Sequence, residues 1–465
     1  MSYERPAMLR HVVGMMNEMG MPSGLNRCVN IDGVSVEGLI KELGSPLIVF
    51  SESAIRKKHA ELKRAFELRY PKVQIAWSYK TNYLQAICAI MHQEGSWAEV
   101  VSEHEYEIAR RLGIEGSKII YNGPYKPEQS LLTAAKEGAI INIDSLSEVY
   151  FLEKIAAAIG RQIEIGMRIN MDTGMYPAWD RFGSNLESGQ AYETAKRIVS
   201  GGRLKLVSLH AHIGTFILEP KFYLQEAMSM CAFASRLKDE FAVTLKYFDI
   251  GGGFASRNRL KSSYLPTNYM APSFDAYAEH ICKIVLEAFP HDKLPTLILE
   301  TGRALVDEAG YLITTVGAAK RLPSGVRALI LDAGVNLMVT SFWYDMEMLP
   351  VQDRGSFLED HVIYGPLCMQ IDVVRDYIKL PPLDRGDNLV VRPFGAYNTS
   401  QWTQFIRMRP PVVMIGENGE VEVIRKGEDI SYLQEKEVLP ERLRIHDEQM
   451  KKIKKNGEKG EKEKK

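Results

Sequence analysis

The chain has 465 residues, of which 45% are hydrophobic and 25% are charged, and its formal net charge at pH 7 is -1. These are the proportions of a folded globular protein, and so balanced a charge gives no reason to expect nucleic acid or an anionic membrane as a partner. The N-terminal residues show no signal peptide, and no apolar run is long enough to span a bilayer. The 5 cysteines are scattered without a CxxC pair, which argues against a zinc site or a disulfide framework. We therefore expect a cytoplasmic protein without a bound metal.

The first two thirds of the chain alternate between strand-like and helix-like runs. Residues 1–45 are expected to form an N-terminal segment that packs with a later β-domain, and within them VSVEGLIKELG predicts a helix that ends at Gly44. Helical stretches separate most of the apolar runs that follow, which are VQIAWSY, WAEVVS, KIIYNG, AIINID, IEIGMRIN, LKLVSLHAH, LKYFDI and LPTLILE. Eight such runs predict an α/β fold with a (β/α)8 TIM barrel over residues 46–309, although an open doubly wound sheet would also alternate.

After this region the sequence becomes rich in β-strand patterns. Runs such as YLITTVGAAKRL, VRALILDAG, LVVRPFGAY and EVEVIRKG predict a second, all-β domain over residues 310–428. Residues 429–465 are dominated by lysine and glutamate and cannot bury a core. We expect them to form a helix that frays into a disordered tail.

Polar residues follow several of the barrel runs at their carboxyl ends, where the catalytic groups of such barrels lie. They are Lys80, His210, His212, Gly251, Gly252, Gly253, Glu300 and Arg303. Each has an ordinary alternative, because a lysine after a strand is usually solvated, glycines often form a plain turn, and a histidine in an apolar strand is often a core residue. Their coincidence at one rim favours a functional site.

Together these residues describe a site for pyridoxal phosphate. Glycine backbone N–H groups and the fork of Arg303 suit a phosphate, and the carboxylate of Glu300 can keep a pyridine nitrogen protonated. An amine such as that of Lys80, in a partly desolvated and cationic site, is expected to have a lowered pKa and to form an imine.

Six segments of the chain make this interpretation specific: WSYKTN, HAHIGT, FDIGGGF, ETGR, GPLCMQID and FGAY. In this order they resemble the motifs of the fold-type III pyridoxal-phosphate decarboxylases, the group of diaminopimelate and ornithine decarboxylases, from about Ile31 to Gly427. Trp77, Thr215 and Thr301 stand where the family has tyrosine, serine and proline. The resemblance implies an alanine racemase-like barrel with a C-terminal β-domain.

The resemblance also assigns roles to residues. It implies that the cofactor is bound by Lys80, His212, Thr215, Gly251, Gly252, Gly253, Glu300, Arg303 and Tyr397. Lys80 would hold it as a Schiff base, His212 would stack on its ring, and loss of carbon dioxide would leave a quinonoid intermediate. Cys368 of the other subunit would then return a proton to Cα, and Tyr397 is expected to cross the same interface. The protein is accordingly expected to be a homodimer with shared active sites.

The substrate pocket departs from both of the best-known relatives. Met369 replaces the acidic residue that follows the cysteine in either enzyme, and Thr340 replaces an arginine of the diaminopimelate enzymes. Candidate substrate residues are Arg181, Tyr344, Asp345, Met369 and Gln370.

Three interpretations of the function remain open. The favoured one is decarboxylation of a modified, conjugated or carrier-protein-linked amino acid, such as a citryl conjugate. Alternatively, a free basic amino acid binds through Asp345 and Gln370, or the substrate is diaminopimelate. An amino-acid racemase is disfavoured, because racemases of this fold place an arginine where Glu300 stands. A non-catalytic pyridoxal-binding protein would lack the β-domain.

Overall fold

The computed structural model describes residues 26–175, 177, 179–261, 263, 271–355 and 357–444. The chain divides into two compact units, residues 1–426 and residues 427–465. Among the described residues, no helix combines the length and apolar character needed to cross a membrane.

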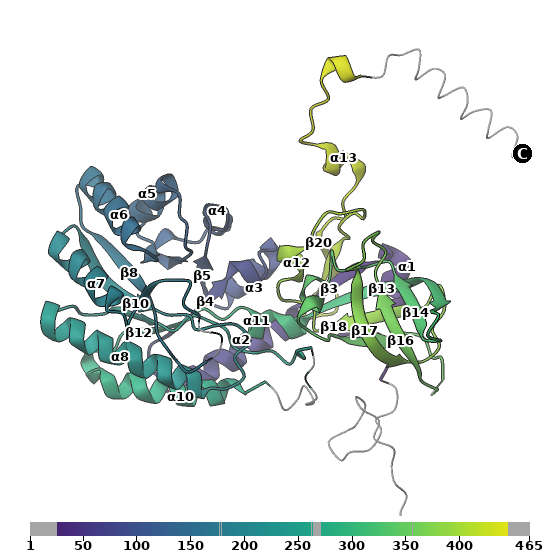
Figure 1. Ribbon diagram of the computed structural model, residues 1–465, viewed down its shortest axis with the longest axis horizontal. Coiled ribbons are helices and arrows are strands. Elements are labelled where there is room, and N and C mark those ends of the chain that lie inside the picture. The colour runs from purple at the N-terminus through teal and green to yellow at the C-terminus, as the bar shows by residue number, and fades with distance from the viewer. Residues whose placement is uncertain are drawn as a thin grey trace, which may run out of the picture. The chain divides into compact units, whose positions relative to one another are not determined.

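A closed barrel of parallel strands forms the larger part of the first unit (Figure 1). Its strands are β4 (Val73–Ser78), β5 (Trp97–Val100), β6 (Ile119–Tyr121), β7 (Ile140–Ile143), β8 (Ile163–Asn170), β10 (Leu204–His210), β11 (Tyr247–Asp249) and β12 (Thr296–Leu299). Each pairs in parallel with its neighbours, and β12 pairs with β4, which closes the sheet. A short strand, β9 (Ser184–Asn185), pairs in parallel with the end of β8. The predicted (β/α)8 barrel is thereby confirmed, and the open sheet is excluded.

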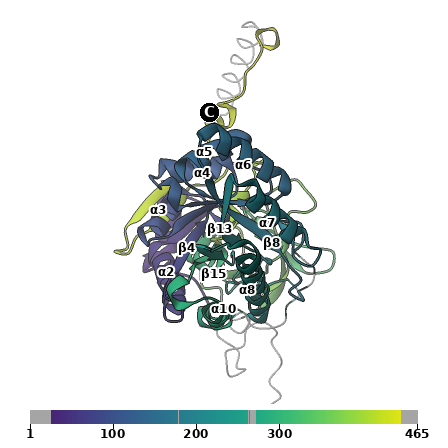
Figure 2. The same cartoon turned by 90° about the vertical axis from the view of Figure 1, so that its left-hand side faces the viewer.

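Helices surround the barrel strands (Figure 2). They are α2 (Glu52–Glu67), α3 (Gln85–Gln93), α4 (Glu103–Arg111), α5 (Glu128–Glu137), α6 (Leu146–Ile159), α7 (Gln190–Gly201), α8 (Lys221–Phe241) and α10 (Phe274–Ala288). Serine caps begin several of them. For example, Ser51 Oγ accepts a hydrogen bond from the N–H of Ala54 at 3.0 Å, which satisfies a donor that the first turn of α2 leaves free.

The β-domain is a mostly antiparallel sheet. Its strands are β13 (Gly310–Arg321), β14 (Arg327–Leu331), β15 (Glu347–Pro350), β16 (Glu359–Tyr364), β17 (Val373–Leu380), β18 (Asn388–Arg392), β19 (Val412–Ile415) and β20 (Val421–Arg425). An earlier strand, β3 (Leu47–Ser51), lies in the same sheet between β13 and β19. The expected barrel boundary at residue 46 is therefore wrong by one strand, because a short apolar run does not reveal which sheet it joins.

The described part of the N-terminal segment also packs with the β-domain. It contains β1 (Asn30–Ile31), β2 (Val34–Ser35) and α1 (Val36–Leu43). The side chains of Val36 and Leu39 lie in one core cluster with Val390 and Val413. Residues 1–25 lie outside the described residues.

The second unit is described by itself up to residue 444. It contains α13 (Ile430–Gln434) and a 3-10 turn, η6 (Glu441–Leu443). The predicted frayed tail falls mainly on residues 445–465, which lie outside the described residues.

The barrel and the β-domain meet at the carboxyl end of β4. Tyr397 N–H donates to the carbonyl oxygen of Thr81 at 2.8 Å, and Ser400 Oγ donates to that of Lys80 at 2.8 Å. The chain packs so closely here that a Cβ on Gly395 would lie 1.9 Å from the carbonyl oxygen of Val306. These contacts fix the segment around α12 (Asn398–Gln401) of the β-domain against the rim of the barrel.

Candidate active site

Lys80 lies in the 3-10 turn η1 (Tyr79–Thr81), directly after β4. Its Nζ donates to Glu99 Oε2 at 2.5 Å, and Ser78 Oγ donates to the same oxygen at 2.6 Å. The Glu99 side chain is fully buried in β5, whereas that of Lys80 is 38% exposed. Lys80 is thus an accessible amine beside a buried carboxylate.

The sequence-based expectation of a lowered pKa for Lys80 is wrong for the protein without cofactor. Burial lowers the pKa of Lys80, but the negative charges of Glu99 and Glu300 outweigh burial and raise it. The amine therefore faces anionic groups, not a cationic site, and it must lose a proton before it can attack a carbonyl carbon. Glu99 is the carboxylate placed to accept that proton.

Glu300 follows β12 and lies in a buried network of hydrogen bonds. Asn122 Nδ2 donates to Glu300 Oε1 at 2.7 Å and to Glu99 Oε1 at 3.0 Å, and His210 Nε2 lies 3.1 Å from Glu300 Oε2. Burial raises the pKa of Glu300, but His210 and Lys80 outweigh burial and lower it. Glu300 is consequently an anion inside the barrel, which suits a partner that carries a protonated nitrogen.

The three glycines after β11 allow very close backbone packing. Gly251 and Gly253 have φ angles of 62° and 97°, and a Cβ on Gly252 would lie 2.4 Å from the carbonyl oxygen of Glu300. The N–H groups of Gly251 and Gly252 donate to Asp249 Oδ1 and His212 Nδ1. Thr215 is exposed on the neighbouring loop after β10. The N–H group of Gly253, in contrast, has no acceptor within the described residues.

Arg303 provides the clearest sign of an anion site. It is 8% exposed, and its Nε and Nη1 have no hydrogen-bond partner among the described residues. The guanidinium lies 4.7 Å from the ring centroid of Tyr344 and 4.8 Å from that of Tyr397. Its Nη1 forms an ion pair with Asp307 Oδ2 at 3.6 Å, which is longer than a hydrogen bond. Buried guanidinium donors without acceptors are costly, and a phosphate would satisfy them. Amine, buried carboxylate and anion site together fit pyridoxal phosphate.

Tyr397 contacts the barrel rim of its own chain, whereas the sequence-based expectation placed it across a subunit interface. Its backbone is bonded to Thr81 and its ring lies on Arg303 of the same chain. The family motif implies that the tyrosine belongs to the site, but a motif does not say which subunit supplies it.

Cys368, Met369 and Gln370 lie on a turn of the β-domain after β16. Cys368 is an exposed free thiol. Asp372 shapes this turn, because its two carboxylate oxygens accept the N–H groups of Val335 and Leu367 at 2.8 and 2.7 Å. Within the described chain, the three turn residues make no hydrogen bond or ion pair with the network around Lys80.

The other three candidate substrate residues, Tyr344, Asp345 and Arg181, lie in different surroundings. Tyr344 is buried against Arg303, whereas Asp345 forms ion pairs with Arg259 at 3.0 Å and Arg375 at 3.3 Å. Arg181 is exposed, with its guanidinium 5.2 Å from the ring centroid of Phe182. The same ring lies 4.6 Å from the guanidinium of Arg168 on β8.

Sequence reasoning missed several members of the network. They are Glu99, Asn122, Asn142, Arg168 and Asp249, all of which are buried. Each is a polar residue in or just after an otherwise apolar barrel strand. That pattern could have identified them, since a polar side chain pointing into a barrel needs partners there.

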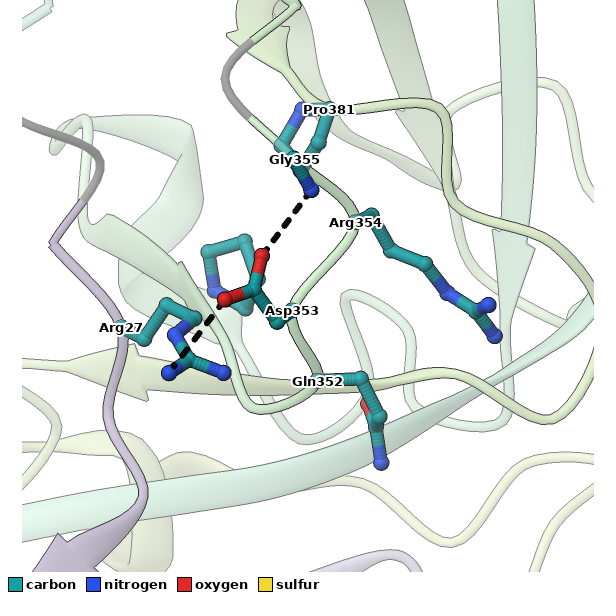
Figure 3. A pocket seen from close by; sticks show the side chains of 7 residues that line it. Arg27, Gln352, Asp353, Arg354, Gly355 and Pro381 are labelled. Atoms are coloured by element: carbon teal, nitrogen blue, oxygen red, sulfur yellow. Dashed lines mark hydrogen bonds and ion pairs between the residues drawn. The ribbon is translucent and has the colours of Figure 1, made fainter.

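A separate surface cavity of about 210 Å³ lies on the β-domain (Figure 3). Arg27 and Asp353 form an ion pair of 3.6 Å in its wall, and Arg354 pairs with Asp387. Its charged groups are already neutralised within the chain, so the cavity offers no reactive group.

Replacing Arg303 by glutamine should weaken the binding of pyridoxal phosphate by about 10- to 100-fold, because charge-assisted hydrogen bonds to the phosphate are lost. Titration of the cofactor-free protein with pyridoxal phosphate, followed by protein fluorescence, measures the effect. Arg257→Gln, at an exposed arginine, is the matched control. Unchanged affinity in Arg303→Gln would remove Arg303 from the phosphate site.

Known proteins share both sequence and fold with this chain. Residues 52–307, more than half of the chain, match the family model described as pyridoxal-dependent decarboxylase, pyridoxal binding domain. The diaminopimelate decarboxylase of Aquifex aeolicus is 29% identical, over 87% of this chain and 94% of its own length. That of Methanocaldococcus jannaschii is 28% identical, over 89% and 95%.

Solved structures give the same result. The crystal structure of the M. jannaschii diaminopimelate decarboxylase has a TM-score of 0.82 at 28% identity and covers 89% of this chain and 97% of its own. A lysine/ornithine decarboxylase of Vibrio vulnificus, at 20% identity and a TM-score of 0.69, shares the fold. The match to the family model, together with the amine, carboxylate and anion site in one barrel, shows that the chain belongs to the pyridoxal-dependent decarboxylases, carboxy-lyases that act on amino acids with pyridoxal phosphate.

Proposed function

We propose that this decarboxylase acts on a modified, conjugated or carrier-protein-linked amino acid, as a homodimer with shared active sites. Pyridoxal phosphate supplies an electron sink for the bond between Cα and the carboxylate. Lys80 would hold the cofactor, Glu300 would face its ring nitrogen, and Arg303 and Tyr397 would bind its phosphate. His212 is the candidate to stack on the ring, and Cys368 of the partner chain is the candidate to return the proton to Cα.

The state of Asp345 is the observation that carries the substrate proposal. In a site for a basic amino acid, this carboxylate would be needed for the distal ammonium group. Here Arg259 and Arg375 already engage it, and two guanidinium groups with one carboxylate leave a net positive charge. Such a cluster disfavours a distal ammonium group and favours a distal part that is neutral or anionic.

Thr340 supports the same conclusion. It stands where the resemblance implies an arginine for the distal carboxylate of diaminopimelate, and it is buried. Its N–H and Oγ1 both donate to Asn398 Oδ1, at 3.1 and 2.9 Å. Thr340 therefore serves the packing of the β-domain and offers no charge to a substrate.

Diaminopimelate is the second candidate, and the comparisons favour it. The relatives reported above carry the name diaminopimelate decarboxylase, and one solved relative, with a TM-score of 0.82 at 27% identity, is described in complex with L-lysine. A racemase finds less support, because the residue that would face the ring nitrogen is Glu300 and not an arginine.

Release of carbon dioxide from a substrate panel separates these possibilities. The panel contains lysine, ornithine, arginine, meso-diaminopimelate, glutamate, and diamino acids acylated on the side-chain amine with citrate or a neutral acyl group. We expect the acylated substrates to exceed free lysine in kcat/KM by about tenfold or more, since a buried charge mismatch costs more than a kilocalorie. Fast turnover of meso-diaminopimelate would refute the conjugate proposal, and loss of chirality without carbon dioxide would indicate a racemase.

A further inference from the structure

Asp249 is a buried carboxyl group to which the functions assigned so far give no role. It is the last residue of β11 and has an exposed fraction of 0%. Its Oδ1 accepts the N–H of Gly251 at 2.9 Å, but its Oδ2 has no hydrogen-bond partner among the described residues. A carboxylate oxygen buried without a donor is costly, so its protonation state needs an explanation.

The explanation lies in its neighbours on the adjacent strands. Asp249, Glu300 and His210 each place one polar atom within 4.8 Å of the others, and all three side chains are buried. Two buried carboxylates at this separation repel each other strongly, so one proton is shared by the pair. The question is which carboxyl group holds it.

The hydrogen bonds around the pair decide this. Glu300 receives a donor from Asn122 at 2.7 Å and lies 3.1 Å from His210, whereas Asp249 has a single backbone donor in the described part of the chain. Burial and the charge of Glu300 raise the pKa of Asp249.

The other charged groups act more weakly on the pair. Glu99 on β5 raises the pKa of Asp249 further. Arg168 on β8 is a cation that interacts with the charges of both Glu300 and Asp249. Lys80 acts on Glu300 and lowers the pKa of that group. The proton therefore belongs on Asp249, and the charge on Glu300.

We propose that Asp249 is a positioning residue whose protonated carboxyl group faces Glu300 and keeps that carboxylate weakly basic. A second proton, the one between Glu300 and the ring nitrogen of pyridoxal phosphate, then stays on the nitrogen. A carboxylate that accepts an additional O–H donor binds a proton less tightly, and the nitrogen beside it then retains its own. The inference rests on the proposed placement of Glu300 at the ring nitrogen.

Infrared spectroscopy of the holoenzyme tests the proton on Asp249 directly. A protonated carboxyl group has a C=O stretching band distinct from that of a carboxylate, and the parent should show this band at neutral pH. Asp249→Asn should remove it. Glu226 is the matched control, because it is also buried, its carboxylate has no hydrogen-bond partner among the residues that the structure describes, and burial raises its pKa as well. Glu226→Gln should remove a separate band and leave that of Asp249.

The nitrogen-15 chemical shift of cofactor labelled at the ring nitrogen tests the effect on the cofactor. Asp249→Asn keeps an N–H donor and should retain the shift of a protonated ring nitrogen, as should Glu226→Gln. Asp249→Ala lacks the donor and should move the shift toward the unprotonated value. It should also lower kcat by about tenfold with less than a twofold change in KM, the pattern of an effect confined to the transition state.

Three results would overturn the inference: an unchanged carboxyl band in Asp249→Asn, an unchanged nitrogen shift in Asp249→Ala, or one equivalent of metal ion bound by His210, Asp249 and Glu300. If Asp249→Ala does not fold, the infrared result with Asp249→Asn still decides where the proton lies. A parent protein that binds no labelled cofactor would instead refute the proposed site, and the two failures are thus distinguishable.

Discussion

Replacement of Lys80 by alanine should abolish the covalent attachment of pyridoxal phosphate and lower the rate of decarboxylation by about 10⁴-fold or more. Lys80 is the accessible amine of the network and lies beside the carboxylate of Glu99, which can take its proton. Without this amine the cofactor can still bind through its phosphate, but the imine to the protein cannot form. The visible absorption of that imine should therefore disappear.

Lys80→Arg is the matched control, because it keeps the positive charge at this position. Lys80→Arg keeps a cation beside Glu99, so the buried carboxylate retains a partner, but a guanidinium is not a nucleophile at neutral pH. We expect Lys80→Arg to fold, to lack the visible band and to be as inactive as Lys80→Ala. Reduction with borohydride followed by peptide mass analysis locates the attachment, and a labelled peptide that lacks residue 80 would contradict the assignment.

The strands and helices of the barrel could be predicted because eight apolar runs repeat between helical stretches. An open sheet would show the same alternation, and the pairing of β12 with β4 excludes it. The β-domain was harder to resolve. Strands such as β15, Glu347–Pro350, and β16, Glu359–Tyr364, contain acidic residues or proline and have weak patterns. The partners of β3 are set by tertiary pairing with β13 and β19, which local sequence does not encode.

In the site, too, the positions of residues that follow barrel strands could be predicted, whereas properties that depend on residues distant in sequence could not. Lys80, Glu300 and Arg303 follow barrel strands, so topology alone brings them to one rim. The pKa of Lys80 was misjudged because it depends on Glu99, a residue inside the next strand that no motif had singled out. The contact of Tyr397 with Thr81 of its own chain could not be predicted, because it is determined by the packing of the β-domain on the barrel.

Asp345 illustrates why the substrate is less predictable than the cofactor. The motif around it resembles that of ornithine-type enzymes, which suggests recognition of a distal amine. The structure adds Arg259, from the loop after β11, and Arg375, from β17, neither of which is close to Asp345 in sequence. Substrate recognition depends on such pairs, which form only in the folded chain.

Mixing two inactive variants, Lys80→Ala and Cys368→Ala, should restore activity if the active sites are shared between subunits. Cys368 is an exposed thiol on the β-domain, whereas Lys80 and Tyr397 lie together in one chain. Alone, Cys368→Ala should lower kcat by about 10²- to 10⁴-fold, the range for loss of a general acid. In a mixed dimer, one site would carry both substitutions and the other would carry neither.

The size of the recovery distinguishes this arrangement from its alternatives. Random exchange of subunits makes half of the dimers mixed, and each has one intact site, so activity should reach about a quarter of the parental value. Arg257→Gln mixed with Lys80→Ala is the control, since both subunits then keep Cys368 and about half of the parental activity should remain with or without exchange. Copurification of untagged Arg257→Gln with affinity-tagged Lys80→Ala measures the exchange itself. Exchange in that control without recovery in the test mixture would show that Cys368 serves its own chain or does not donate the proton. Cys368→Ala with parental kcat would exclude the thiol from the reaction altogether.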